Sequence, residues 1–170
     1  MPEVESFCFF MAVLQLLVSC RYIIRSESLM SANLSGAWED IPLPSSNTFN
    51  KHFWGSRYRN AGGSRVDVEF DVDPAASNEM GFIHGAYLAA AAEMVLSLPI
   101  WLTGTIEYGR AVTVDFDLKY VANLKAEGGL QAEVDLVHQT GRLGFVRGLL
   151  KQGETVLVSF QGTMRKLPPV

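Results

Sequence analysis

A single carboxylate, Glu93, lies in the middle of an otherwise apolar stretch, and no other residue of the sequence is placed so well for chemistry. The stretch covers residues 83–98, holds five alanines and has Glu93 as its only charged member. Burying a carboxylate among apolar side chains is costly unless it is paired, hydrogen-bonded or protonated. Glu93 therefore either lies in a functional site or faces water or an ion pair.

His84 and Gly85 stand at the start of the same stretch, after the short segment Gly81-Phe82-Ile83. The first amide groups of a helix have no partner within it, and the helix dipole adds partial positive charge there. Such an amide can hold a carbonyl oxygen on which negative charge develops. A His-Gly pair alone is a weak signal, because Gly85 could merely permit close packing and His84 could be a hydrogen-bonded loop residue.

The spacing of these residues favours a site made from two chains. Nine positions separate His84 from Glu93. In a helix this spacing gives about 13 Å along the axis and opposite faces, so one chain cannot bring both to one reacting atom. Two antiparallel helices could place the Gly85 end of one chain beside Glu93 of the other. The sequence therefore predicts at least a homodimer with two equivalent sites.

The elements that must position these residues follow from hydrophobic periodicity. Residues 83–98 predict one long helix, apolar on nearly all sides and therefore buried, which Pro99 ends or kinks. Apolar and polar residues alternate in residues 65–72, 112–120 and 130–137, which predicts three strands. Two further strand-like segments follow at 143–150 and 155–164, separated by a turn. Sequential hairpins predict antiparallel pairing. The expected fold class is α+β, one antiparallel sheet on one long helix.

Composition bounds the class of protein. The chain has 170 residues, a net charge of −4 and no run of Lys and Arg, so nucleic acid is not expected as a partner. Its two cysteines, Cys8 and Cys20, exclude a disulfide framework and a cysteine-based zinc site. Its three histidines have no paired metal spacing. We expect neither a metal nor a cofactor.

The N-terminal region is set apart from the predicted domain. Residues 7–18 are apolar except for Gln15, but a membrane-spanning helix needs about 20 residues, and Glu3 and Glu5 stand where a signal peptide is positive. Residues 1–29 are a short apolar helix, a mis-called start or a signal-like segment. We predict an extension and arm over 1–48, a domain over 49–167, no stable membrane insertion and a cytoplasmic location. Residues 49–59 are a short helix or a first strand.

Together, these residues resemble the hotdog-fold acyl-CoA thioesterases, in particular their PaaI-like, phenylacetate-type branch. That family has an Asn six residues before a His-Gly-Gly, and an acid nine residues after the His. Here the corresponding residues are Asn78, His84-Gly85-Ala86 and Glu93. The strand at 112–120 is also similar, with Thr113 preceding Val-Asp. The resemblance covers roughly residues 49–166.

The resemblance implies a hotdog fold, an antiparallel β-sheet wrapped around one central helix, assembled as a homodimer or homotetramer. It implies hydrolysis of an acyl-CoA thioester to free acid and coenzyme A at a subunit interface. Carried over residue by residue, Glu93 would be the general base or nucleophile and the Gly85 N–H would bind the thioester oxygen. Asn78 would orient the water or thioester, His84 would support the loop, and Thr113 would assist Glu93.

The sequence departs from the family pattern at three positions. Ala86 replaces the second Gly of the motif, and Glu93 replaces the commoner Asp. Thr113 falls on the polar face of its strand, so its role requires that this face lines the site. Coenzyme A also carries phosphates, for which Arg142, following Gly141 in a turn, is the best candidate contact.

Two other classes of function remain open from the sequence. One is a non-catalytic acyl-CoA-binding or structural hotdog dimer, which would be expected to lack the acid that Glu93 supplies. The other is a hydratase or dehydratase of the same fold. That chemistry usually needs an Asp and a His in one site, and His84 is distant from Glu93 within one chain.

Overall fold

The computed structural model describes residues 36–43, 48–53, 55–126 and 128–169, which belong to one compact unit, Gly36–Val170. The predictions for residues 1–29 lie outside the described residues. The unit begins earlier than the predicted boundary at residue 49, because β1 (Glu39–Asp40) pairs with β2 (Arg57–Gly62) and Ile41 is buried in the core. Residues 49–59 supply both a short 3-10 helix, η1 (Phe49–Phe53), and the start of β2.

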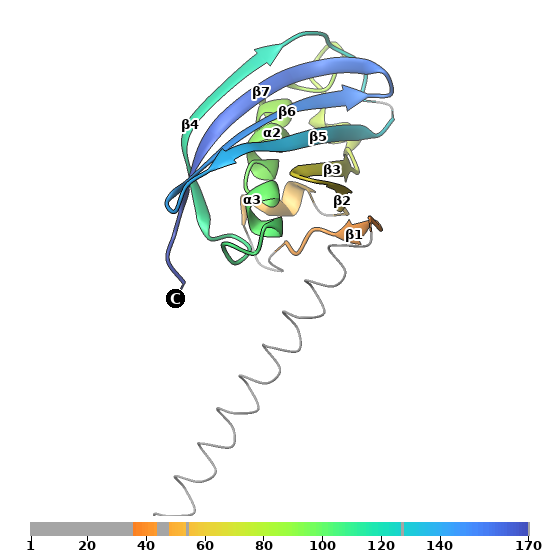
Figure 1. The fold of residues 1–170 in the computed structure, drawn as a ribbon. Coiled ribbons are helices and arrows are strands. Elements are labelled where there is room, and N and C mark those ends of the chain that lie inside the picture. Colours follow the sequence, from red (N-terminus) through yellow and green to blue (C-terminus); the bar gives the residue numbers. More distant parts are fainter. Residues whose placement is uncertain (1–35, 44–47, 54, 127, 170) are drawn as a thin grey trace, which may run out of the picture. The chain divides into compact units, whose positions relative to one another are not determined.

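The strands form one antiparallel sheet of seven strands that curves around a central helix (Figure 1), which confirms the predicted α+β hotdog fold. After β2 come β3 (Arg65–Phe70), β4 (Ala111–Tyr120), β5 (Leu130–Gln139), β6 (Leu143–Gln152) and β7 (Thr155–Lys166). The order across the sheet is β1-β2-β3-β5-β6-β7-β4.

The prediction of sequential hairpins is right for β5, β6 and β7 but wrong for β4. Strand β4 pairs with β7, and β3 pairs with β5, so β4 forms one edge of the sheet. The helical segment carries the chain from β3, on one side of the sheet, to the opposite edge (Figure 1). Periodicity reveals each strand but not its neighbour.

The predicted helix over 83–98 is two helices, α2 (Gly85–Val95) and α3 (Leu98–Leu102). Pro99 lies in the first turn of α3, where its missing N–H is tolerated, so it starts a helix rather than ending one. Residues 85–102 are apolar and long enough to cross a membrane by composition, but half of that stretch is buried inside the domain. Leu88, Ala91, Ala92 and Val95 form the buried face of α2.

Glycines on the inner face of the sheet allow the helical segment to approach it closely. A Cβ built on Gly144 would lie 2.3 Å from Ile100 Cδ1, and one on Gly162 would lie 2.8 Å from Leu96 Cδ1. Separations this short do not occur between real side chains. The two glycines therefore fix how deeply α3 and the end of α2 sit against β6 and β7.

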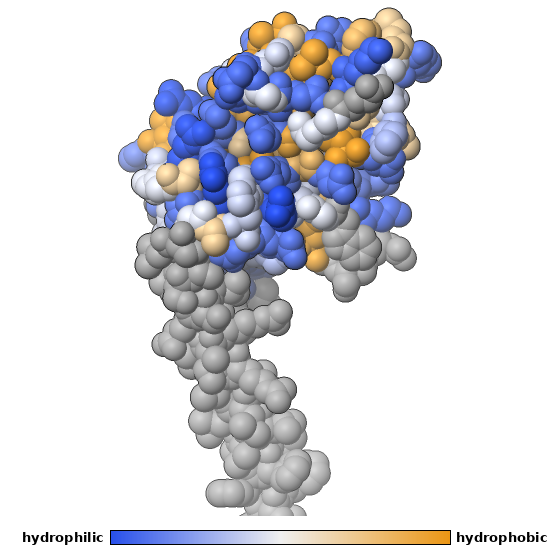
Figure 2. Space-filling model, turned by 90° about the vertical axis from the view of Figure 1, so that its right-hand side faces the viewer, coloured by the Kyte–Doolittle hydropathy of each residue, from blue (hydrophilic) through white to orange (hydrophobic). Residues whose placement is uncertain are grey.

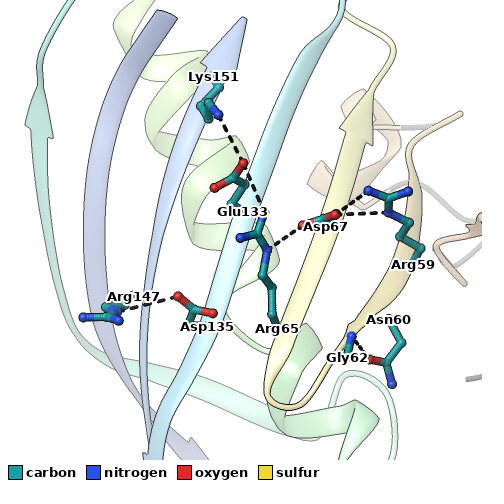
Figure 3. Close-up of polar contacts among 9 residues, drawn as sticks. All are labelled: Arg59, Asn60, Gly62, Arg65, Asp67, Glu133, Asp135, Arg147 and Lys151. Carbon is teal, nitrogen blue, oxygen red and sulfur yellow. Dashed lines mark hydrogen bonds and ion pairs between the residues drawn. The ribbon is translucent and has the colours of Figure 1, made fainter. Parts of the chain in front are cut away.

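Charged side chains form an ion-pair ladder across β2, β3, β5 and β6 (Figure 3). The ladder comprises Arg59–Asp67, Arg65–Asp67, Arg65–Glu133, Lys151–Glu133 and Arg147–Asp135. Figure 2 shows the side of the domain opposite the β4 edge, where hydrophilic residues surround smaller hydrophobic patches. A ladder of paired charges is typical of a surface that faces water.

Candidate active site

The loop before α2 is held by Asn78. Its side-chain Oδ1 accepts hydrogen bonds from the amides of Met80 (3.0 Å) and Phe82 (3.1 Å). Its backbone amide donates to Phe82 O, and its carbonyl accepts from Gly81 N. Gly81 has a positive φ of 77°, which favours glycine at this turn. Asn78 therefore organises the loop through its oxygen, and only its side-chain NH₂ is left for another partner.

His84 is the N-cap of α2 and Gly85 is its first helical residue. The His84 Nδ1 accepts a hydrogen bond from Ala86 N at 3.0 Å, and its carbonyl accepts from Leu88 N. No described residue accepts a hydrogen bond from the Gly85 amide. The Gly85 N–H at the positive end of the helix is therefore available for an anionic or polarised oxygen.

Glu93 lies eight residues further along α2 and is exposed in the single chain, where the sequence predicted a helix buried on nearly all sides. The buried residues of α2 are Leu88, Ala91, Ala92 and Val95, and Glu93 lies outside this buried face, toward the edge strand β4. The Thr113 hydroxyl of β4 donates a hydrogen bond of 2.5 Å to Glu93 Oε1. A hydrogen bond to a carboxylate fixes its orientation.

A β-bulge explains how Thr113 reaches Glu93. The register between β4 and β7 shifts between Thr113 and Asp115, so Val114 has no partner on β7. Before the bulge Thr113 faces the helix; after it Phe116 and Leu118 do. Simple alternation predicts that Val112 and Val114 lie on the same face of the strand as Phe116. This prediction is wrong, because the extra residue in the bulge moves the side chains before it to the opposite face. The side of Thr113 does line the candidate site.

The far end of β4 contacts the other end of α2 through Tyr120, a residue that the sequence reasoning missed. The Tyr120 hydroxyl donates a hydrogen bond of 2.8 Å to the carbonyl of Gly85. Strand β4 thus runs antiparallel to α2, with Thr113 beside Glu93 and Tyr120 beside Gly85. The signal for this contact was present, since Tyr120 follows Phe116 and Leu118 in the same alternation.

The structure brings Glu93 together with Thr113, and Gly85 together with His84 and the Asn78 loop. It does not bring Glu93 to Gly85, since eight residues of helix span about 12 Å.

Gly141 and Arg142 lie in the β5–β6 turn. The carbonyl of Arg142 accepts from Lys166 N, and Lys166 pairs with Ala111, so this turn lies at the Thr113 end of β4.

Tyr87, the third residue of α2, packs on Phe53. Burial raises the pKa of Tyr87 to about 12, with smaller contributions from the charges of Asp71 and Asp73. Its hydroxyl is buried and has no hydrogen-bond partner among the described residues. Within the described part of the chain, no group of three His, Cys, Asp or Glu side chains gathers as a metal site.

Comparison with known proteins connects this arrangement to a family. The model of the thioesterase superfamily matches residues 80–159, the segment that holds α2, β4 and most of the following sheet. No curated protein sequence matches the chain.

Solved structures share the fold at low identity. A mutant of the phenylacetic acid degradation protein PaaI from Thermus thermophilus has 21% identity and a TM-score of 0.60, covering 71% of this chain and 100% of that one. Zebra fish thioesterase superfamily member 2 has 20% identity and a TM-score of 0.62, with 72% and 88% covered. A hypothetical thioesterase protein from Streptococcus pneumoniae, solved with coenzyme A, has 20% identity and a TM-score of 0.60, with 68% and 88% covered.

The resemblance drawn from Asn78, His84-Gly85 and Glu93 is therefore confirmed by the match to the thioesterase superfamily model and by the shared fold. Residues 80–159, which include Gly85 and Glu93, match the thioesterase superfamily, and the domain around them has the hotdog fold.

Proposed function

We propose that the protein hydrolyses an acyl-coenzyme A thioester to a free acid and coenzyme A, in a homodimer with two equivalent sites. The observation that carries this proposal is the Glu93–Thr113 hydrogen bond at one end of β4, together with the open Gly85 amide at the other. Thioester hydrolysis needs a carboxylate or base for the attack and a donor for the developing oxyanion, and these two groups supply both.

In the general-base form, Glu93 accepts a proton from water as the water oxygen adds to the thioester carbonyl carbon. The carbonyl oxygen becomes an oxyanion and is held by the Gly85 N–H of the other protomer. The C–S bond then breaks, and the departing thiolate takes the proton from Glu93 to give coenzyme A and the acid. In the nucleophilic form, a Glu93 oxygen adds to the same carbon, and the C–S bond breaks to release the coenzyme A thiolate and leave a mixed anhydride. Water then hydrolyses this anhydride to the free acid and the Glu93 carboxylate, and the proton released goes to the thiolate.

The β4 edge is the surface that we propose for dimerisation. Val112, Val114 and Val121 are 46%, 61% and 61% exposed along it. An exposed apolar edge strand is a template for pairing with another strand. Antiparallel pairing of β4 with its twofold copy places the Thr113 end of one strand beside the Tyr120 end of the other. Since these ends carry Glu93 and Gly85, each site then takes one group from each chain.

The remaining site residues support this arrangement. We assign to Asn78 the holding of the loop before α2, and to its free NH₂ the orientation of the water or thioester. His84 caps the helix and leaves the Gly85 amide open. No cofactor or metal takes part in the proposed chemistry. The cytoplasmic location and the lack of stable membrane insertion remain predictions from the sequence.

The direct test is a panel of acyl-coenzyme A substrates with a reagent that detects the released thiol. We expect turnover with at least one aromatic or aliphatic acyl group. Binding of acyl-coenzyme A without turnover would instead support the non-catalytic dimer, and formation of a hydrated acyl-coenzyme A would support the hydratase reading.

Thr113→Val should lower kcat about 10- to 100-fold, because a hydrogen bond to a charged group contributes about 1.5–3 kcal/mol. Val keeps the β-branched shape of Thr, so the strand and the dimer should persist. Thr113→Ser keeps the hydroxyl and is the matched control, with kcat within a few-fold of wild type. Steady-state kinetics on both variants checks this, and an equal kcat for Val and wild type would contradict the role of Thr113.

Arg142→Ala should raise KM for acyl-coenzyme A about 3- to 10-fold and leave kcat unchanged, as expected for an exposed charge that meets a phosphate. No carboxylate among the described residues pairs with Arg142. Arg147→Ala is the matched control, because Arg147 is exposed but faces Asp135 at 3.7 Å. A KM change of the same size with an acyl-pantetheine substrate, which lacks the nucleotide, would contradict this assignment.

A further inference from the structure

We infer that Tyr120 is a positioning residue for the oxyanion-binding amide, holding the first turn of α2 against the end of β4. This inference rests on the proposed function and assigns a role to a residue outside the family motif. Two independent contacts support it, a hydrogen bond and a packing contact, both made to Gly85.

The hydrogen bond anchors the backbone of the first helical residue. The Tyr120 Oη donates to the Gly85 carbonyl at 2.8 Å, on the peptide unit that follows the open amide. The N–H at the other end of this peptide unit, that of Ala86, donates to His84 Nδ1. The Gly85 backbone is thus held from two directions, by a helix cap and by a sheet residue, while its own N–H keeps no described partner.

The packing contact explains why this position is glycine. A Cβ built on Gly85 would lie 3.3 Å from Tyr120 Oη and 3.4 Å from its Cε1 and Cζ atoms, tighter than most real Cβ contacts. Gly85 does not have a positive φ, so backbone conformation does not require glycine there. The ring of Tyr120 favours it, because a Cβ at this position would fit only if the ring moved away by a few tenths of an ångström.

The consequence is that one strand sets both halves of the proposed chemistry. Thr113 orients the carboxylate and Tyr120 orients the amide, from opposite ends of β4. Tyr120 is 57% exposed in the single chain and lies on the edge that we propose for dimerisation. Misplacing a donor by a fraction of an ångström weakens its interaction with the transition state more than its interaction with the substrate.

Tyr120→Phe tests the hydrogen bond. The variant keeps the ring and removes only the hydroxyl, so we expect an intact dimer, an unchanged KM and a kcat lowered about 3- to 10-fold. Tyr108→Phe is the matched control, because Tyr108 packs on Trp101 away from Gly85. An unchanged kcat for Tyr120→Phe in folded dimer would overturn the inference, and so would an equal loss of kcat in Tyr108→Phe.

A double-variant cycle tests the packing contact. Gly85→Ala should lower kcat in the wild-type background, where its Cβ crowds Tyr120. It should cause no further loss in a Tyr120→Ala background, where the ring is gone. If the two substitutions lowered kcat additively, the contact between Gly85 and the Tyr120 ring would not be the cause of the loss in Gly85→Ala. Wild-type turnover is measured in the same assay, so failure of the proposed function itself would be seen separately, as a lack of turnover without any substitution.

Discussion

Replacing Glu93 by Gln should lower kcat about 100-fold or more while leaving KM and the dimer in place. Gln keeps the size of the side chain and can still accept the hydrogen bond of 2.5 Å from Thr113, but it cannot accept a proton or act as a nucleophile. Because Glu93 is exposed in the single chain, the substitution leaves no buried group without a partner, and the melting temperature should stay within a few degrees. Glu93→Asp should keep partial activity, since the carboxylate is retained but withdrawn by one methylene.

The matched control is Glu79→Gln, which makes the same change of charge on an exposed residue of the loop before α2. We expect its kcat and KM to equal those of wild type. Both kinetics and melting temperature are measured on the same preparations. A Glu93→Gln protein that melts differently but turns over as fast as wild type per folded molecule would show that Glu93 serves structure rather than chemistry.

Gly85→Pro should abolish most turnover, because proline removes the one N–H that the mechanism uses. Proline is favoured at the first position of a helix, and the preceding residue must be extended, as His84 is at φ −63° and ψ 134°. The helix should therefore form, with kcat lowered about 100- to 1,000-fold. Gly85→Ala adds the same Cβ against Tyr120 but keeps the N–H, so its kcat should fall much less than that of Gly85→Pro.

The two inactive variants together test the two-chain site. A dimer with one Glu93→Gln chain and one Gly85→Pro chain contains one site with both groups intact and one site with neither. Differently tagged chains, co-expressed and purified through both tags, should recover about half of the wild-type activity from two inactive parents. A mixed dimer as inactive as its parents, when both parents are folded dimers, would exclude a site shared between chains.

Much of this architecture follows from local patterns in the sequence. The alternation in residues 65–72 and 130–137 predicts β3 and β5, and the apolar run around Glu93 predicts the central helix. Helical arithmetic on His84, Gly85 and Glu93 also indicates that the site needs two chains, which agrees with the separation of Gly85 from Glu93 in the structure. Strands repeat every two residues and helices every 3.6 residues, so both patterns depend on residues that are close in sequence. The strands and the central helix can therefore be predicted from the sequence alone.

The misses concern contacts between distant segments. The sequence does not reveal the bulge at Val114, because Val112, Val114 and Phe116 continue an apolar alternation that the structure breaks. The alternation of Phe116, Leu118 and Tyr120 places Tyr120 on the inner face of its strand, but it does not identify Gly85 as the residue that Tyr120 contacts. Pairing of β4 with β7 rather than β5 depends on where the helix delivers the chain. These features depend on which elements meet, and a single sequence does not specify this locally.

The pairing of β4 with β7 also sets the order in which the site can form during synthesis. Strand β4 has β7, the last strand of the chain, as its neighbour in the sheet. Before β7 has left the ribosome, the strand that carries Thr113 and Tyr120 has no ladder to join, although α2 and β3 are already available. Closing β4 against β7 also joins segments separated by a long loop, a slow step in folding. The nascent chain therefore keeps β4 unpaired, and its carboxylate and amide unaligned, until β7 has been synthesised.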